Sequence, residues 1–196
     1  MSLVAISGNV SGTGTLTIAA PNTNSNYTLT LPTNTGTLIS TKSAGTVLQV
    51  VQTTKTNSFT TTSGSAVDIT GLSVSITPSS TTSKILVSVM METGHTGNDL
   101  GHSYLYLVRN STNIFIADTA GSRKSATLVG NYLEQVMQSK VVQYLDSPST
   151  TSSVTYKMQA LTTAGTFCIN RSGRDSDNTN FDGRGVSSIT VMEIAA

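Results

Sequence analysis

Short runs in which apolar and polar residues alternate follow one another along this chain, and this period of two constrains the fold more than any other feature. From residue 46 onward, runs such as "SAVDITGLSVSITP" and "SVTYKMQALT" are separated by clusters of Gly, Ser, Asn or Pro, which favour turns. Helix-forming Glu, Lys and Arg are scarce, because only 11% of the 196 residues are charged. We therefore expect an all-β protein in which residues 43–196 form one antiparallel, jelly-roll-like β-sandwich of about eight strands.

The run "NYLEQVMQSKVVQYL" fits a helix as well as a strand. The residues that would form a helical stripe are Leu133, Val136, Met137, Val141, Tyr144 and Leu145. The adjacent Val141 and Val142 and the neighbouring strands favour a strand for residues 131–146, with a helix as the alternative. The segments "RNSTN" and "DSPSTTSS" are both expected to be short hairpin connections.

Residues 1–41 contain no Asp, Glu, Lys or Arg, yet they include the alternating runs "GTLTIAAP", "NYTLTLP" and "GTLIS". The apolar residues on the repeated face of these runs are Leu16, Ile18, Tyr27, Leu29, Leu31 and Leu38. Two or three short strands bury too little surface to be stable alone. We expect residues 1–42 to form a small β module for attachment or trimerisation; a flexible leader is the alternative, since such a composition is also typical of disorder.

Two of the expected strands are apolar on both faces, whereas a sandwich strand normally has one polar face. In "KILVSVMME" the second face carries Leu86 and Met90, and in "SSITVMEI" it carries Met192 and Ile194. This pattern predicts contact with copies of the same chain, with covering loops as the alternative. A homotrimer would also explain the uncharged N-terminal segment, because a charge near a threefold axis faces two like charges at short range.

Composition also limits the partners that the protein can have. A net charge of +1 gives no electrostatic reason to bind nucleic acid or an anionic membrane. No apolar run reaches the roughly 18 residues of a membrane span, and "MSLVAISGNVSG" lacks the basic start of a signal peptide. Cys168, the single cysteine, alternates with apolar residues in "GTFCINR" and is expected to be a core residue rather than a nucleophile. We expect no cofactor.

The segment "METGHTGNDLGHS" brings Glu92, His95, Asp99 and His102 together in what we expect to be an exposed, Gly-rich loop. Such side chains are proper zinc ligands, but their spacing matches no specific motif. Two alternatives remain: a metal site, or a cluster of histidines near a symmetry axis that would respond to pH.

The segment "NRSGRDSDNTNFDGRG" concentrates charge. Its charged residues are Arg171, Arg174, Asp175, Asp177, Asp182 and Arg184. It lacks the ligand spacing and the final Glu of an EF-hand calcium loop, which leaves calcium binding as an alternative only. We expect mutual salt bridges that order a long loop, whose exposed polar side chains also suit hydrogen bonding to glycans.

Catalytic patterns are missing from the sequence: it has no G-x-S-x-G, H-E-x-x-H, P-loop or dinucleotide-binding motif. Asp68 and Glu134 lie within expected strands and could project inward, but nothing marks them as a glycosidase pair. We therefore expect that the protein is not an enzyme; a polysaccharide-degrading or metal-dependent enzyme on the same scaffold is the weakest alternative.

Two sets of residues carry a family resemblance. The string "GTGTLTIAAPNTNSNYTLTLPTNTGTLIS" resembles a short module of tail-fibre and other structural proteins of bacteriophages. The strings "YLYLVRNSTNIFIADTAGSR", "YLDSPSTTSSVTYKMQ" and "INRSGRDSDNTNFDGRGVSSITVMEIA" are similar to those of β-sandwich tip domains in phage fibres, spikes and capsid decorations. The resemblance implies a trimer of jelly-roll-like sandwiches with an N-terminal attachment module, and no catalytic residue.

The chain has no long shaft of heptads or repeated turns, which is a departure from a full tail fibre. We therefore expect a capsid cement or decoration protein, assembled in the host cytoplasm, that docks on the major capsid protein or another structural protein of the virion surface. The alternative is the receptor-binding tip of a tail fibre or spike. Host polysaccharide would then contact the two loops that carry His95, Asp99, His102, Arg171, Arg174, Asp175, Asp177, Asp182 and Arg184.

Overall fold

The computed structural model describes residues 11–14, 24, 43–96, 101–130, 136–180 and 182–196. The chain divides into two compact units, Met1–Leu38 and Ile39–Ala196. The attachment residues expected in the first unit lie outside the described residues; these are Leu16, Ile18, Tyr27, Leu29, Leu31 and Leu38. The following paragraphs concern the second unit.

The described part of the second unit is built from eleven strands and contains no helix, so it has none that is long and apolar enough to cross a membrane. The strands are β1 (Val47–Lys55), β2 (Phe59–Thr61), β3 (Val67–Ile76), β4 (Lys84–Thr96), β5 (Ser103–Arg109), β6 (Thr112–Ile114), β7 (Leu128–Gly130), β8 (Gln138–Asp146), β9 (Val154–Thr162), β10 (Thr166–Ile169) and β11 (Ser187–Ile194). The expected all-β class is therefore confirmed.

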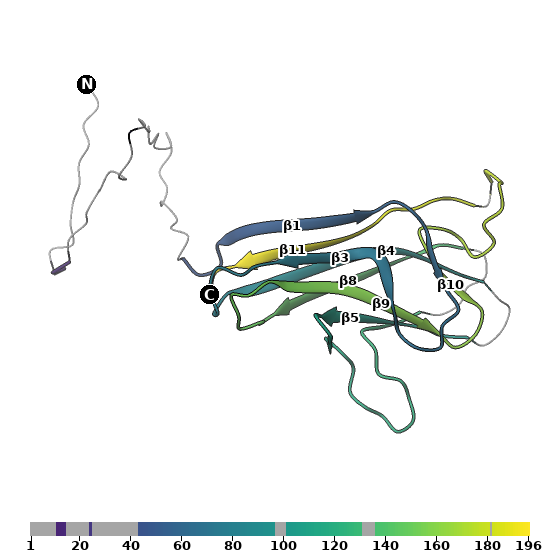
Figure 1. Ribbon diagram of the computed structural model, residues 1–196, viewed down its shortest axis with the longest axis horizontal. Helices are drawn as coiled ribbons and strands as arrows, with labels where there is room; N and C mark the ends of the chain where they lie inside the picture. Colours follow the sequence, from purple (N-terminus) through teal and green to yellow (C-terminus); the bar gives the residue numbers. More distant parts are fainter. Residues whose placement is uncertain (1–10, 15–23, 25–42, 97–100, 131–135, 181) are drawn as a thin grey trace. The chain divides into compact units, whose positions relative to one another are not determined.

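The strands form two antiparallel sheets that face each other (Figure 1). The first sheet has the order β1-β11-β4-β10-β2, with β8 on the other side of β4. The second has the order β3-β9-β5-β6, with β7 also paired to β5. The long pairings are nested, since β1 joins β11, β3 joins β9, β4 joins β8 and β5 joins β7. Such nesting is what a long hairpin gives when it is rolled into two sheets, so the expected jelly-roll-like sandwich is confirmed.

The core lies between the two sheets and is filled by every second residue of the long strands. Ile85, Val87, Val89 and Met91 of β4 are all fully buried, and the intervening residues face outward. The other sheet contributes its own alternate positions; its fully or nearly fully buried residues include Ile69, Leu72, Val74, Leu105, Leu107, Tyr156 and Met158. Cys168 is also fully buried, and burial raises the pKa of its thiol, as expected for a core residue rather than a nucleophile.

The segment with two competing interpretations is a strand from Gln138 onward, and the described residues Val136 and Met137 before it are neither strand nor helix. β8 pairs along its full length with β4, from Gln138 opposite Thr93 to Asp146 opposite Ile85. This pairing outweighs the helical stripe, because it satisfies the backbone and buries Val142 on the core side. Residues 131–135 lie outside the described part.

One of the two expected hairpins is confirmed and the other is wrong. Asn110 and Ser111 connect β5 to β6 directly, and Asn110 has the positive φ of 55° that tight turns require. Residues 147–153 instead lead from β8 in the first sheet to β9 in the second. Both connections are rich in residues that favour turns, so the local sequence did not reveal that the second connection leads to the other sheet.

The alternating run "NIFIADT", residues 113–119, also predicts a strand, and this prediction is wrong beyond the start of the run. β6 ends at Ile114, because Phe115 has a φ of 52°, which breaks an extended backbone. Phe115 then stacks on Tyr144 of β8 with ring centroids 4.9 Å apart, and the chain continues as an exposed loop to Ala126.

A fully buried carboxylate, Glu193, lies near the end of the sandwich where residue 43 enters. Gln49 donates to it through Nε2 at 2.6 Å, and the backbone N and the Oγ of Ser79 each donate at 2.7 Å. Burial alone would raise the pKa of Glu193, but these hydrogen bonds outweigh it and lower the pKa to about 2, from an ordinary value of 4.5. The charge therefore ties β1, β11 and the β3–β4 connection together.

We expect Glu193→Gln to lower the free energy of unfolding at pH 7 by about 1–3 kcal/mol, because it removes a charged acceptor of three hydrogen bonds. Since the folded-state pKa is depressed, the stabilisation is present above the unfolded pKa near 4.5 and is lost as pH falls toward 2. Urea unfolding at pH 7, 4 and 2.5 should show the wild type and the variant converging in acid.

Ser75→Ala is the matched control, since it removes an exposed hydrogen bond to Thr155 on the other sheet and should change stability little at any pH. A difference between wild type and Glu193→Gln that stays constant from pH 7 to pH 2.5 would contradict this account of Glu193.

Candidate functional site

The charged loop between β10 and β11, residues 170–186, leaves the sandwich from a rigid base. Asn170 is fully buried and has a φ of 61°. Its Nδ2 donates to the carbonyl oxygens of Lys55 at 2.7 Å and Asn57 at 3.1 Å, while Ser187 Oγ donates to its Oδ1 at 2.6 Å. The amide thus joins the start of the loop to its end and to the end of β1.

A close backbone crossing fixes the next residues. A Cβ on Gly94 would lie 2.3 Å from the carbonyl oxygen of Arg171, and one on Gly173 would lie 1.8 Å from that of His95. Real Cβ atoms do not approach so closely, so only glycine fits at either position. The end of β4 and the start of the 170–186 loop therefore pack directly backbone against backbone.

Asp182 orders the middle of this loop. It accepts from Arg174 Nε at 2.9 Å, from Ser172 Oγ at 2.5 Å and from the backbone N of Ser176 at 3.1 Å. The hydrogen bond from Arg174, followed by those from Ser172 and Ser176, holds the pKa of Asp182 far below its usual range. This carboxylate stays ionised well into acid.

Asp175 forms a second cluster with two arginines. Its carboxylate accepts from Arg184 and from Arg171, and these contacts lower the pKa of Asp175, that with Arg184 most. Together with the Arg174–Asp182 pair, these contacts confirm the expected mutual salt bridges. Asp177, the remaining charged residue predicted here, is exposed at the tip.

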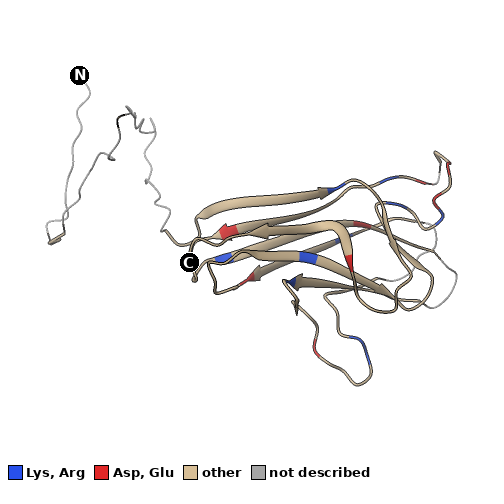
Figure 2. Cartoon of the chain, in the orientation of Figure 1, with Lys and Arg blue, Asp and Glu red and all other residues tan. Residues whose placement is uncertain are grey.

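Beside these clusters the loop encloses an open recess of about 370 Å³. Apart from Gly183, every residue that lines it has a polar or charged side chain: Asp175, Ser176, Asp177, Asn178, Thr179, Asp182 and Arg184. Figure 2 shows that acidic and basic residues gather along this loop, far from the end of the sandwich where residue 43 enters. The recess is within the size range of small-ligand sites, and its carboxylate, amide, hydroxyl and guanidinium groups suit a ligand rich in hydroxyls.

The expectation of an exposed loop at residues 91–103 is wrong for its first half. β4 continues through Gly94 to Thr96, and His95 is only 5% exposed. The cause is the glycine crossing described above, which lets β10 pair with this extension. Asp99 lies outside the described residues, and His102 is exposed with its ring 6.4 Å from that of Tyr104.

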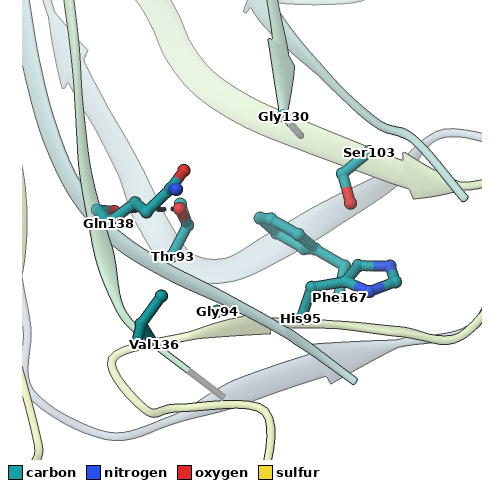
Figure 3. A pocket seen from close by; sticks show the side chains of 8 residues that line it. All are labelled: Thr93, Gly94, His95, Ser103, Gly130, Val136, Gln138 and Phe167. Atoms are coloured by element: carbon teal, nitrogen blue, oxygen red, sulfur yellow. Dashed lines mark hydrogen bonds between the residues drawn. The ribbon is translucent and has the colours of Figure 1, made fainter. Parts of the chain in front are cut away.

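His95 lies beside a small cavity of about 10 Å³ between the sheets, near Phe167 and Ser103 (Figure 3). The hydroxyl of Thr162 donates to the carbonyl oxygen of Ala164, so it accepts from His95 Nε2 at 3.0 Å. Burial lowers the pKa of His95. Within the described ranges, no three His, Cys, Asp or Glu residues lie close enough together to hold a metal ion. These residues therefore offer no ligand set for the metal alternatives.

The two carboxylates considered for glycoside chemistry are not brought together by any described contact. Asp68 points to the solvent side of β3, where it accepts from Lys157 at 2.8 Å and Gln159 at 2.7 Å; the suggestion that it projects inward is wrong. The hydrogen bond from Lys157, with that from Gln159, lowers the pKa of Asp68. Glu134 lies outside the described residues.

Sequence reasoning missed Asn170, which anchors the 170–186 loop at three points. Its only sequence signal is an Asn directly after an alternating run, and that signal predicts a turn without its long-range partners. The charged residues of the loop were found because they cluster along the sequence.

These features define an antiparallel jelly-roll-like sandwich with a polar recess in an ordered loop. No family model and no curated protein matches the chain. Among solved structures, the chain is similar to the crystal structure of the infectious bursal disease virus VP2 subviral particle, with a TM-score of 0.35 and 13% sequence identity. The match covers 74% of this chain and 41% of that chain, and the fold assignment given above rests on strand pairing alone.

We expect Asp182→Ala to loosen the 170–186 loop, because Arg174, Ser172 and Ser176 lose their shared acceptor. Trypsin should then cut after Arg174 and Arg184 several-fold faster than in the wild type, since local opening governs cleavage of a folded loop. Mass spectrometry of the fragments measures both rates.

Asp177→Ala is the control, because Asp177 is exposed at the tip and carries none of the loop's ion pairs among the described residues. Equal cleavage of Asp182→Ala and Asp177→Ala would mean that Asp182 does not order the loop.

Proposed function

We propose that this protein is a structural component of a bacteriophage surface, a trimeric capsid cement or decoration protein that docks through residues 1–42 and holds its sandwich outward. The sequence resemblance to phage structural proteins supports the setting. The proposal assigns no catalytic activity to the chain.

The observation that carries the proposal is that the chain enters the sandwich at one end and the charged loop lies at the other. Gly45 and Thr46 are bound to Ala195, the residue directly after β11, by hydrogen bonds from Gly45 N to Ala195 O at 2.8 Å and from Ala195 N to Thr46 O at 2.9 Å. The 170–186 loop lies at the opposite end of the strands (Figure 1). A chain held by the residues before position 43 would therefore present this loop away from its support.

A second candidate, the receptor-binding tip of a tail fibre or spike, is favoured by the polar recess of about 370 Å³ in the same loop. Both proposals need the same orientation, with the loop outermost. They differ in the number of copies on a particle, because a shell carries many attachment points and a tail few.

Quantitative mass spectrometry of purified particles should find this protein at a copy number close to that of the major shell protein. A few dozen copies or fewer would instead support the receptor-binding tip. Absence from purified particles would refute both.

A chain that lacks residues 1–42 should lose attachment to particles while the sandwich stays folded, because every described strand lies beyond residue 46. Co-sedimentation with particles measures attachment, and circular dichroism reports the fold. Undiminished attachment of the truncated chain would show that docking uses another surface.

A further inference from the structure

The outward side of four neighbouring strands forms a flat surface that we name the uncharged face. Strand register aligns its side chains in three rows that run across β1, β11, β4 and β8. The apolar row is Val50, Met192, Leu86 and Leu145; the polar row is Gln52, Thr190, Ser88 and Gln143; the mixed row is Thr54, Ser188, Met90 and Val141. Within the polar row, Gln52 Nε2 donates to Thr190 Oγ1 at 2.8 Å.

None of the residues in these rows is charged, although the same strands do carry charges. The charged side chains either point to the same side of the sheet as the core residues or lie beyond the ends of the rows. Lys55, Asp146 and Glu193 are buried, and Lys140 alternates in step with buried Val142. Lys84 and Glu92 sit in phase with the face but beyond its two ends. The four strands therefore keep charge away from this surface.

The second sheet provides the comparison. On β3 and β9 its outward side carries an ion pair between Asp68 and Lys157 at 2.8 Å and a further hydrogen bond from Gln159 to Asp68. Apolar residues of the same side, Tyr106 and Val108 of β5 and Leu161 of β9, are buried in a cluster with Ala126 of the loop after β6. The outer side of the second sheet therefore has charges and covered apolar residues, whereas the uncharged face has no charge in its rows and leaves apolar residues exposed.

Large apolar side chains on the uncharged face are open to solvent in the single chain. Val50 is 55% exposed, Val141 60%, Leu145 54% and Met90 44%. Contiguous exposed apolar patches larger than a few hundred Å² are rare on monomeric soluble proteins and mark interaction sites. A partner packed on the face would cover these side chains.

We infer that the partner is a second copy of this chain, packed on the uncharged face about a rotation axis parallel to the strands. Such a rotation keeps each row at its own height, so an apolar row meets an apolar row and amides and hydroxyls meet their own kind. Identical copies also meet without like-charge repulsion, which any Lys or Glu in these rows would cause. The matching of the rows and the absence of like-charge repulsion both follow from the strand register.

An axis in this direction has a second consequence, which relies on the proposed function for its setting. It directs residue 43 of every copy to the same end of the assembly and the 170–186 loop of every copy to the other. An axis perpendicular to the strands would reverse one copy. Only the parallel axis lets all copies share one docking surface.

The three rows cover about 20 Å of strand length across four strands about 4.8 Å apart, which gives about 380 Å² on each copy. Two copies bury about 760 Å² in the rows themselves. Residues beside the rows must therefore add to the contact for it to reach the roughly 1,000 Å² of a stable specific interface.

Sedimentation equilibrium of the full-length chain should give the mass of a dimer or trimer. Leu145→Glu and Val141→Glu each place a charge in the face on a side chain that is open in the single chain, so the fold, checked by circular dichroism, should be kept. Each variant should weaken association about tenfold or more, toward the mass of a single chain.

Val129→Glu is the matched control, since Val129 is 49% exposed on β7 of the other sheet and its variant should associate like the wild type. A wild-type chain that is monomeric at about 100 µM, well above the micromolar range of specific association, overturns the inference. So does an oligomer that neither face variant weakens. Either result can occur whether or not the protein is found on particles, so the proposed function is tested separately.

The direction of the axis has its own test at Met90, in the mixed row on a central strand. Met90→Lys and Met90→Glu should each be largely monomeric, and an equal mixture of the two should associate, because the parallel axis brings the mixed row against itself, whereas an axis perpendicular to the strands would bring it against the apolar row. A mixture that stays monomeric contradicts the parallel axis.

Discussion

The fold depends on burying one side of each of two sheets against the other. Every second residue of the long strands enters this shared core, as Ile85, Val87 and Val89 of β4 do. Because the side-chain period of a strand is two, a shift of one residue would move the whole apolar set to the wrong side. Burial therefore fixes register, and register in turn decides which residues lie side by side on the outside.

The two outer surfaces that result have different chemistry. One carries Asp68 paired with Lys157, and its apolar residues Tyr106 and Leu161 are buried in a cluster with Ala126. The other carries Val50, Leu145 and their neighbours in uncharged rows. At the far end of the strands, Asn170 anchors a loop whose ion pairs are satisfied within the loop. The uncharged face and the 170–186 loop are therefore separate regions of the sandwich.

The sequence predicted the features that depend on local pattern. Alternation was sufficient for the all-β class, for the two-sided character of residues 84–92 and 187–194, and for the turn at Asn110. It did not predict that residues 147–153 change sheet, because strand order depends on partners far away in the sequence. The sequence also led us to expect His95 in a loop, because a glycine such as Gly94 is as typical of a turn as it is of a close backbone crossing.

The pairing of β1 with β11 has a consequence for how the chain reaches this structure. Val50 and Met192 are neighbours in the first sheet although they come from opposite ends of the domain. During synthesis β1 has no strand partner until β11 has left the ribosome, so the first sheet can be completed only after that point. Folding of such a topology is expected to be slow, because long loops must close before their contacts form. In that interval β1 is an unpaired strand edge, which makes aggregation the chief competitor of correct folding.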